Sequence, residues 1–154
     1  MFTTSPHHRS LYVYHLHMGG PDADALEWRA LLSPRFGPKL EHMGVTHVSS
    51  AADADIVVVT GLLMKQNLDG VLEELSHAPL PCVIIAAGNA AIHGGVWSKL
   101  GMTSLTLHPL SHYADVQVSV PGDPPTPQSL IAALAAAAEI LSRPGERLPP
   151  WREA

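Results

Sequence analysis

Short runs of β-branched and other apolar residues alternate along this chain with segments of helical periodicity. We expect strands at 11–17, 45–49, 56–60, 82–87 and 115–120. Strands that alternate with helices are typical of a parallel sheet, because each parallel strand is reached through a crossover that usually contains a helix. The pattern therefore predicts an α/β fold, with an open parallel sheet and helices on both of its faces.

Helices are expected between these strands, where apolar residues recur at the spacing of an α-helix. The pattern indicates helices at 23–32, 66–76 and 128–141, the last of which is rich in alanine. Residues 33–38 include two prolines and a glycine, and we expect them to end the first helix. Residues 88–95 are mostly small and are expected to form a loop after the central strand.

Length and composition fit one compact domain. The chain has 154 residues, of which 46% are hydrophobic, and this is enough for a single sizeable core. We expect a flexible N-terminus at 1–10, an α/β domain at 11–142 and a C-terminal tail at 143–154.

Charge and hydropathy exclude two classes of interaction. The formal net charge is -5 at pH 7, and lysine and arginine are scattered along the sequence. A chain without a basic stripe is not expected to bind nucleic acid. No apolar run approaches the roughly 20 residues that cross a bilayer. We therefore expect a soluble, cytoplasmic chain.

Three loops rich in glycine or proline follow expected strands, at 19–24, 88–91 and 121–125. Ligands and cofactors of parallel sheets bind at the carboxyl ends of the strands, since loop amides and helix N-termini converge there. None of the three loops contains a cysteine, and the one cysteine of the chain, Cys82, lies in an apolar run. An iron–sulfur cluster held by thiolates needs about four such ligands, so these loops cannot hold one.

The order of motifs along the chain resembles one family. The motifs are Gly19-Gly20 followed by Glu27, the stretches 30–36 and 54–61, Gly88 with Ala91 and Gly94-Gly95, and finally 120–127. Together they resemble the small subunit of membrane-bound (group 4) nickel–iron hydrogenases. They are similar also to the cluster-carrying 20 kDa subunit of respiratory complex I. The resemblance covers residues 11–141.

The resemblance implies a flavodoxin-like fold and the position of a [4Fe-4S] cluster. In this family, two cysteines from the first loop and one from each of the other two bind the cluster, which exchanges electrons with the large subunit. The motifs place these ligands at Pro21, Asp24, Ala90 and Asp123, none of which is a cysteine. Proline and alanine offer no side-chain donor, and aspartate is a hard oxygen ligand. We therefore expect no cofactor, and the [4Fe-4S] cluster of the family to be absent.

The resemblance also implies a structural role that does not depend on the cluster, because family members pack this edge of the sheet against the large subunit. The implied partners are a hydrogenase large-subunit-like or complex I 49 kDa-like protein and the membrane subunits of the same complex. The chain would then be peripheral on the cytoplasmic face of the membrane, as a cluster-less and non-catalytic subunit of an oxidoreductase-like assembly. We expect the partner interface to include Glu27, Arg35, Thr60, Gly61, Gly122 and Pro124.

Two other interpretations of these loops stay open. Asp24 and Asp123, with His93 or His17, could bind a divalent cation, or the two aspartates could hydrogen-bond loop amides in place of the cluster. Alternatively, the loops could bind a small molecule, although the chain has neither a GxGxxG fingerprint nor a P-loop lysine motif. No catalytic triad can be recognised from sequence order alone, so we assign no catalytic residue.

Overall fold

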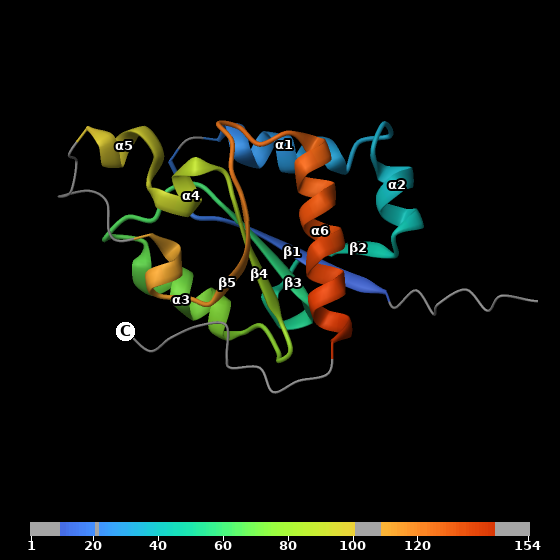
Figure 1. The fold of residues 1–154 in the computed structure, drawn as a ribbon. Helices are drawn as coiled ribbons and strands as arrows, with labels where there is room; N and C mark the ends of the chain where they lie inside the picture. Colours follow the sequence, from blue (N-terminus) through green and yellow to red (C-terminus); the bar gives the residue numbers. More distant parts are fainter. Residues whose placement is uncertain (1–9, 21, 101–108, 144–154) are drawn as a thin grey trace, which may run out of the picture.

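The computed structural model describes residues 10–20, 22–100 and 109–143 (Figure 1). Its centre is a five-stranded sheet of order β2-β1-β3-β4-β5, in which every neighbouring pair is parallel. The strands are β1 (Leu11–His17), β2 (Val45–Val48), β3 (Ile56–Thr60), β4 (Val83–Ala87) and β5 (Val116–Val120). This order is that of a flavodoxin-like, doubly wound sheet, and it confirms the predicted fold class.

Helices cover both faces of the sheet. The α-helices are α1 (Ala23–Leu31), α2 (Gly37–His42), α3 (Leu68–Ser76), α4 (Asn89–His93), α5 (Gly95–Lys99) and α6 (Pro127–Ser142), and the 3-10 turns are η1 (Ala51–Asp53) and η2 (Leu110–His112). Apolar side chains of α1, α2 and α6 share one core with the sheet, and those of η1, α3, α4 and η2 share the other. Every residue of β3 and β4 is buried, because a strand covered on both faces must be apolar throughout.

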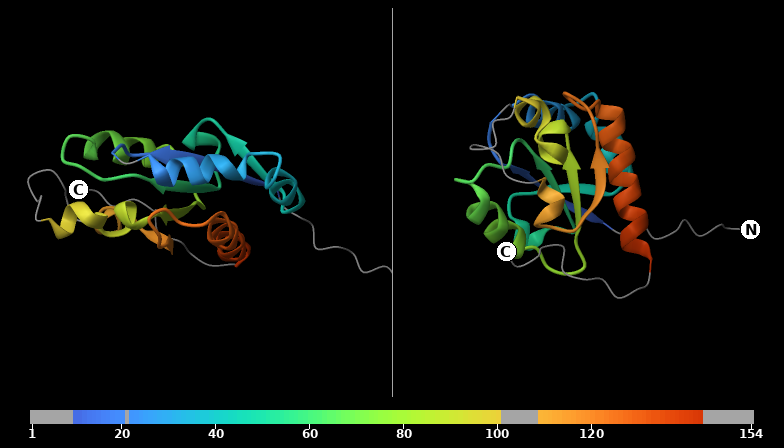
Figure 2. Two further views of the ribbon diagram at one scale, coloured as in Figure 1. Left: turned by 90° about the horizontal axis from the view of Figure 1, so that it is seen from above. Right: turned by 60° about the vertical axis from the view of Figure 1, so that its left-hand side comes forward.

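The last helix is fixed at its start by its sequence. The hydroxyl of Thr126 accepts a hydrogen bond from the backbone N–H of Ser129, 3.2 Å away, and Pro127 occupies the first turn, where its missing N–H costs no helical bond. The helix then runs along β5, as the right-hand view of Figure 2 shows. Within the described ranges, no helix is long and apolar enough to cross a membrane.

Residues 33–38 follow the end of the first helix as predicted, since α1 ends at Leu31. The sequence did not predict α2, which begins at Gly37, because Pro38 sits in the first helical turn and does not disrupt it. One sequence expectation needs correction. Residues 88–95 were expected to be a loop, yet they contain α4 and the start of α5, which meet at Gly94. The proposed division at residues 10 and 143 stays a prediction, since the terminal segments lie almost wholly outside the described residues.

Candidate functional site

The loops that follow β1 and β3 are hydrogen-bonded to each other at the carboxyl edge of the sheet. The N–H of Met18 donates to the carbonyl of Thr60 over 2.8 Å, and the N–H of Leu62 donates to the carbonyl of Gly19 over 2.9 Å. In Figure 1, α1, α4 and α5 lie along this upper edge. The structure therefore brings the described parts of the three glycine- and proline-rich loops to one edge, as the sequence predicts.

Asn67 holds the first two loops together. Its Nδ2 donates to the carbonyls of Met18, at 2.6 Å, and Leu62, at 3.1 Å, while its Oδ1 accepts from the N–H of Met64 at 2.8 Å. One amide side chain thus satisfies three main-chain groups that no strand pairs.

Asn89 makes the equivalent connection between the loops after β4 and β5. Its N–H donates to the carbonyl of Gly122 over 2.8 Å, and its Oδ1 accepts from the N–H of Gly122 over 2.9 Å. The N–H of Gly88 adds a bond of 2.8 Å to the carbonyl of Val120. Hydrogen bonds within the protein therefore hold this pair of loops in place.

Thr60 lies between two histidines of the neighbouring strand. Its hydroxyl oxygen is 2.8 Å from Nε2 of His15 and 2.9 Å from Nδ1 of His17, because the β1–β3 register pairs His17 with Thr60. A hydroxyl carries one proton, so it donates to at most one ring and accepts from the other. Nε2 of His17 is in turn 3.1 Å from Oδ1 of Asp22. Thr60 is fully buried, and the two histidine rings are the partners of its hydroxyl.

His15 is held uncharged at neutral pH. Burial, aided by the nearby His17, Arg29 and His47, lowers its pKa to about 4. Its ring lies 5.8 Å from that of Trp28, centroid to centroid, with the planes tilted by 38°. The pair packs α1 against the end of β1.

Asp24 occupies the space beside Gly88. Asp24 stands in the first turn of α1 and is only 4% exposed. Gly88 has φ +94°, and a Cβ at this position would overlap the Asp24 carboxylate. We call the place where Asp24, Gly88 and the 122–123 segment meet the inter-loop site.

The charge of Asp24 is poorly compensated. Burial raises the pKa of its carboxyl, the negative Asp123 raises it further, and His17 acts in the opposite direction. Oδ1 of Asp24 is buried without a hydrogen-bond partner. Oδ1 therefore does not bond to a loop amide, and the amides of Asn89 and Gly122 already have partners. That the two aspartates bond to loop amides through other oxygens stays a prediction.

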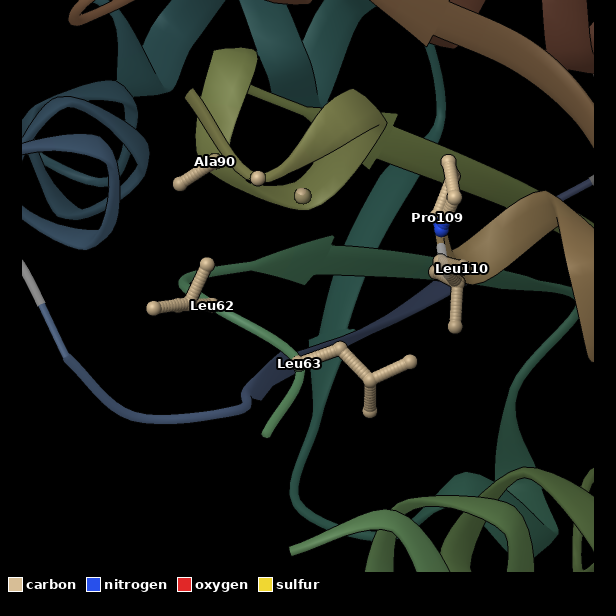
Figure 3. Close-up of a pocket in the computed structure, with 7 residues that line it drawn as sticks. Leu62, Leu63, Ala90, Pro109 and Leu110 are labelled. Carbon is tan, nitrogen blue, oxygen red and sulfur yellow. The ribbon is translucent and has the colours of Figure 1, made fainter. Parts of the chain in front are cut away.

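Ala90, expected at a ligand position, borders a small hollow rather than a polar site. The hollow lies between α4, the loop after β3 and η2, and Figure 3 shows Leu62, Leu63, Ala90, Pro109 and Leu110 around it. All the side chains that line it are apolar. This part of the edge offers no donor to a metal or an anion.

The expected interface residues differ in exposure. Arg35 and Pro124 are exposed and Glu27 and Gly122 are partly so, whereas Gly61 is buried and a Cβ there would lie 2.5 Å from the carbonyl oxygen of Gly19. The guanidinium of Arg35 lies 5.3 Å from the ring centre of its neighbour Phe36. Pro21, the remaining expected ligand position, lies outside the described residues.

In the part of the chain that the structure describes, the side chains at this edge fit neither a metal ion nor a thiolate-bound cluster. His93 uses Nδ1 to accept from the N–H of Gly95 at 3.2 Å. Among the described residues, no three His, Cys, Asp or Glu side chains converge closely enough to hold a metal ion. Cys82 is 2% exposed, and burial raises its pKa to about 12. The residues at this edge therefore do not fit a thiolate-bound cluster.

Sequence reasoning missed three residues that organise the edge, Asn67, Asn89 and His15, and considered His17 only as a ligand for a cation, not as a partner of Thr60. The two histidines were visible at the end of an expected strand, but their shared contact depends on strand register, which short apolar runs do not define. The asparagines were visible as polar residues beside glycine-containing loops. That position is a usable signal, because asparagine amides often bond to nearby main-chain groups.

The fold and the organised loops at its carboxyl edge define a flavodoxin-like domain of the class that places its functional site at that edge. The chain belongs to the NADH ubiquinone oxidoreductase 20 Kd subunit family, whose sequence profile matches residues 21–137. This membership confirms the resemblance drawn from the motifs.

Individual relatives agree with the family. The chain is 33% identical over 135 residues to the probable membrane-bound hydrogenase subunit mbhJ of Pyrococcus furiosus, which covers 88% of this chain and 78% of that one. It is 32% identical over 139 residues to formate hydrogenlyase subunit 7 of Escherichia coli, covering 88% of this chain but 51% of that one. The chain thus spans about half the length of the second relative.

A solved structure supports the fold. A chain of the membrane-bound sulfane sulfur reductase, an archaeal respiratory membrane complex, superposes with a TM-score of 0.70 at 22% identity. The match covers 86% of this chain and 70% of that one.

Proposed function

We propose that this protein is a cluster-less, non-catalytic subunit of a hydrogenase-like or complex I-like assembly. It docks a large-subunit-like partner without carrying the [4Fe-4S] cluster of the family. The complex is membrane-associated, and the chain is peripheral on its cytoplasmic face through the partner subunits. The names of the relatives, which include a membrane-bound hydrogenase subunit and a formate hydrogenlyase subunit, support an assembly of this kind.

One observation carries the proposal: the carboxyl edge is organised although its donors do not fit a cluster. Asn67 bonds to Met18 and Leu62, and Asn89 bonds to Gly122, so the side chains of the protein fix these loops. These hydrogen bonds keep the loops ordered although the positions of the family's cluster ligands carry no cysteine. An ordered edge without donors for iron is suited to contact a partner.

Exposed apolar side chains support the same conclusion. Leu26 on α1 is 57% exposed, and Val96 and Leu100 in and just after α5 are 53% and 66% exposed. Both helices flank the carboxyl edge (Figure 1). Apolar side chains that are exposed on helices beside the edge are suited to burial against a partner protein.

The test is to recover the protein with whatever binds it. A tagged full-length chain is purified gently from the membranes of its own organism, co-purifying proteins are identified by mass spectrometry, and iron is measured per copy of the chain. We expect a hydrogenase- or complex I-like large subunit and membrane subunits, with no iron assignable to this chain. Recovery of the chain alone, or with a bound nucleotide or flavin, would contradict the proposal.

A further inference from the structure

Three buried side-chain atoms in the described part of the chain have no hydrogen bond: Nε2 of His17, Oδ1 of Asp24 and Nε1 of Trp28. All three come from the end of β1 or from α1, next to the inter-loop site. Nε2 of His17 lies 3.1 Å from Oδ1 of Asp22. Oδ1 of Asp24 has no hydrogen-bond partner, and His17 is the group that favours the charged form of Asp24. Unpaired buried polar groups are rare in native proteins, and each requires an explanation such as a bound water, an ion, a ligand or a functional role.

Asp24 is the unusual member of the three because its side chain is negatively charged when it is ionised. No lysine or arginine of the described residues forms an ion pair with Asp24 or Asp123. Burying a carboxylate beside a second carboxylate, without a cation, destabilises a protein. Asparagine would fill the same space beside Gly88 without that cost. The charge of Asp24 is therefore better explained by something that binds to it than by packing.

We infer that the inter-loop site receives a lysine or arginine side chain of the large-subunit-like partner. The exposed Asp123 meets the cation directly, and the buried Asp24 lies below and attracts it through a medium of low dielectric. This inference rests on the proposed function. The sign of the charge is consistent with it, since a cluster held by four thiolates is itself anionic and two carboxylates keep negative charge at the same place.

The geometry favours a side-chain cation over a metal ion. Magnesium and calcium take about six or more oxygen ligands, and within the described ranges no third His, Cys, Asp or Glu joins Asp24 and Asp123. A guanidinium or ammonium group needs no such cage, because its donors bond to carboxylates directly. Docking also removes water from the pair, which strengthens the attraction.

The test uses the full-length chain in its native assembly. The variants are Asp24→Asn and Asp123→Asn, alone and together, with Asp69→Asn on the exposed surface of α3 as the matched control. The amount of large subunit retained is measured by quantitative mass spectrometry while membranes are washed with rising potassium chloride. Thermal unfolding of each isolated chain checks that folding is intact, and Asp123→Asn provides an exposed variant in case Asp24→Asn fails to fold.

We expect the double variant to retain about tenfold less large subunit than wild type, to depend less on salt, and to unfold at the same or a higher temperature. Asp69→Asn should behave as wild type. If wild type retains the large subunit and the double variant does so equally at every salt concentration, this inference is wrong and the proposed function stands. If wild type retains none, both fail. A stoichiometric divalent metal in wild type that is lost from the double variant would also overturn the inference.

Discussion

The carboxylate of Asp24 lies against the α-carbon of Gly88, so the first turn of α1 is packed directly on the residue that precedes α4. Gly88 has φ +94°, a conformation that side chains other than glycine adopt only under strain. The Asp24 carboxylate therefore leaves no room for a Cβ at position 88, and the absence of a Cβ at Gly88 leaves the space that the carboxylate fills.

Replacing Gly88 by alanine should destabilise the protein by about 2–4 kcal/mol, because the new methyl group meets both the backbone strain and the Asp24 carboxylate. The free energy of unfolding in urea measures this. Gly70→Ala is the matched control: Gly70 lies in α3 with nothing within 4 Å of a built Cβ, and alanine there should stabilise by about 0.5–1 kcal/mol. Equal effects of the two substitutions would show that Gly88 is not tightly packed.

Asp24→Asn should stabilise the isolated chain at neutral pH, by on the order of 1 kcal/mol. Because the folded state raises the pKa of this carboxyl above its ordinary 3.8, the folded state binds the proton more tightly than the unfolded chain. The contribution of Asp24 to stability is therefore largest in acid and is lost as the pH rises through the folded pKa. Unfolding of both proteins from pH 3 to pH 8 measures the difference, and a gain that does not shrink in acid would contradict this account.

Thr60→Val keeps the shape of the side chain but removes the hydroxyl between the rings of His15 and His17. We expect a loss of about 2 kcal/mol, because two partly buried ring nitrogens lose their common partner. Thr46→Val on the exposed surface of β2 is the control and should change stability by less than about 0.5 kcal/mol. Comparable losses in the two variants would indicate that the Thr60 hydroxyl does not bridge the histidines.

His15 should make the protein sensitive to mild acid. Its pKa is about 4 in the folded state and 6.5 as the ordinary value, so the unfolded chain binds the proton first as the pH falls. Stability from this group is complete above pH 6.5 and declines toward pH 4, by on the order of 1–3 kcal/mol for a partly buried ring. His15→Gln should flatten this slope, whereas His77→Gln, at an exposed position after α3, should not. An unchanged slope in His15→Gln would refute the assignment.

The strands were predictable because buried parallel strands leave a simple signal, a short apolar run such as that of β3 or β4. The helices α2, α4 and α5 were not, because each has five or six residues and contains or borders glycine. Helices this short owe their stability to tertiary contacts rather than to helical propensity.

The candidate site was predictable in position but not in its contacts. The order of motifs predicted that the site lies in these loops, which the structure brings to one edge of the sheet. The bridge from Thr60 to His15 and His17 depends on the β1–β3 register, and the unpaired oxygen of Asp24 depends on how α1 meets Gly88. The spacing of residues along the chain predicts neither of these contacts. The partner-interface residues stay a prediction.

Anaerobic reconstitution with iron and sulfide tests whether this edge can hold an iron–sulfur cluster. Bound iron and the electron paramagnetic resonance spectrum after reduction are measured for the wild-type chain, with a variant that carries Pro21→Cys, Asp24→Cys, Ala90→Cys and Asp123→Cys as the positive control. The account predicts no bound cluster in wild type and about four irons per chain in the variant. About four irons and a cluster spectrum in wild type would contradict it.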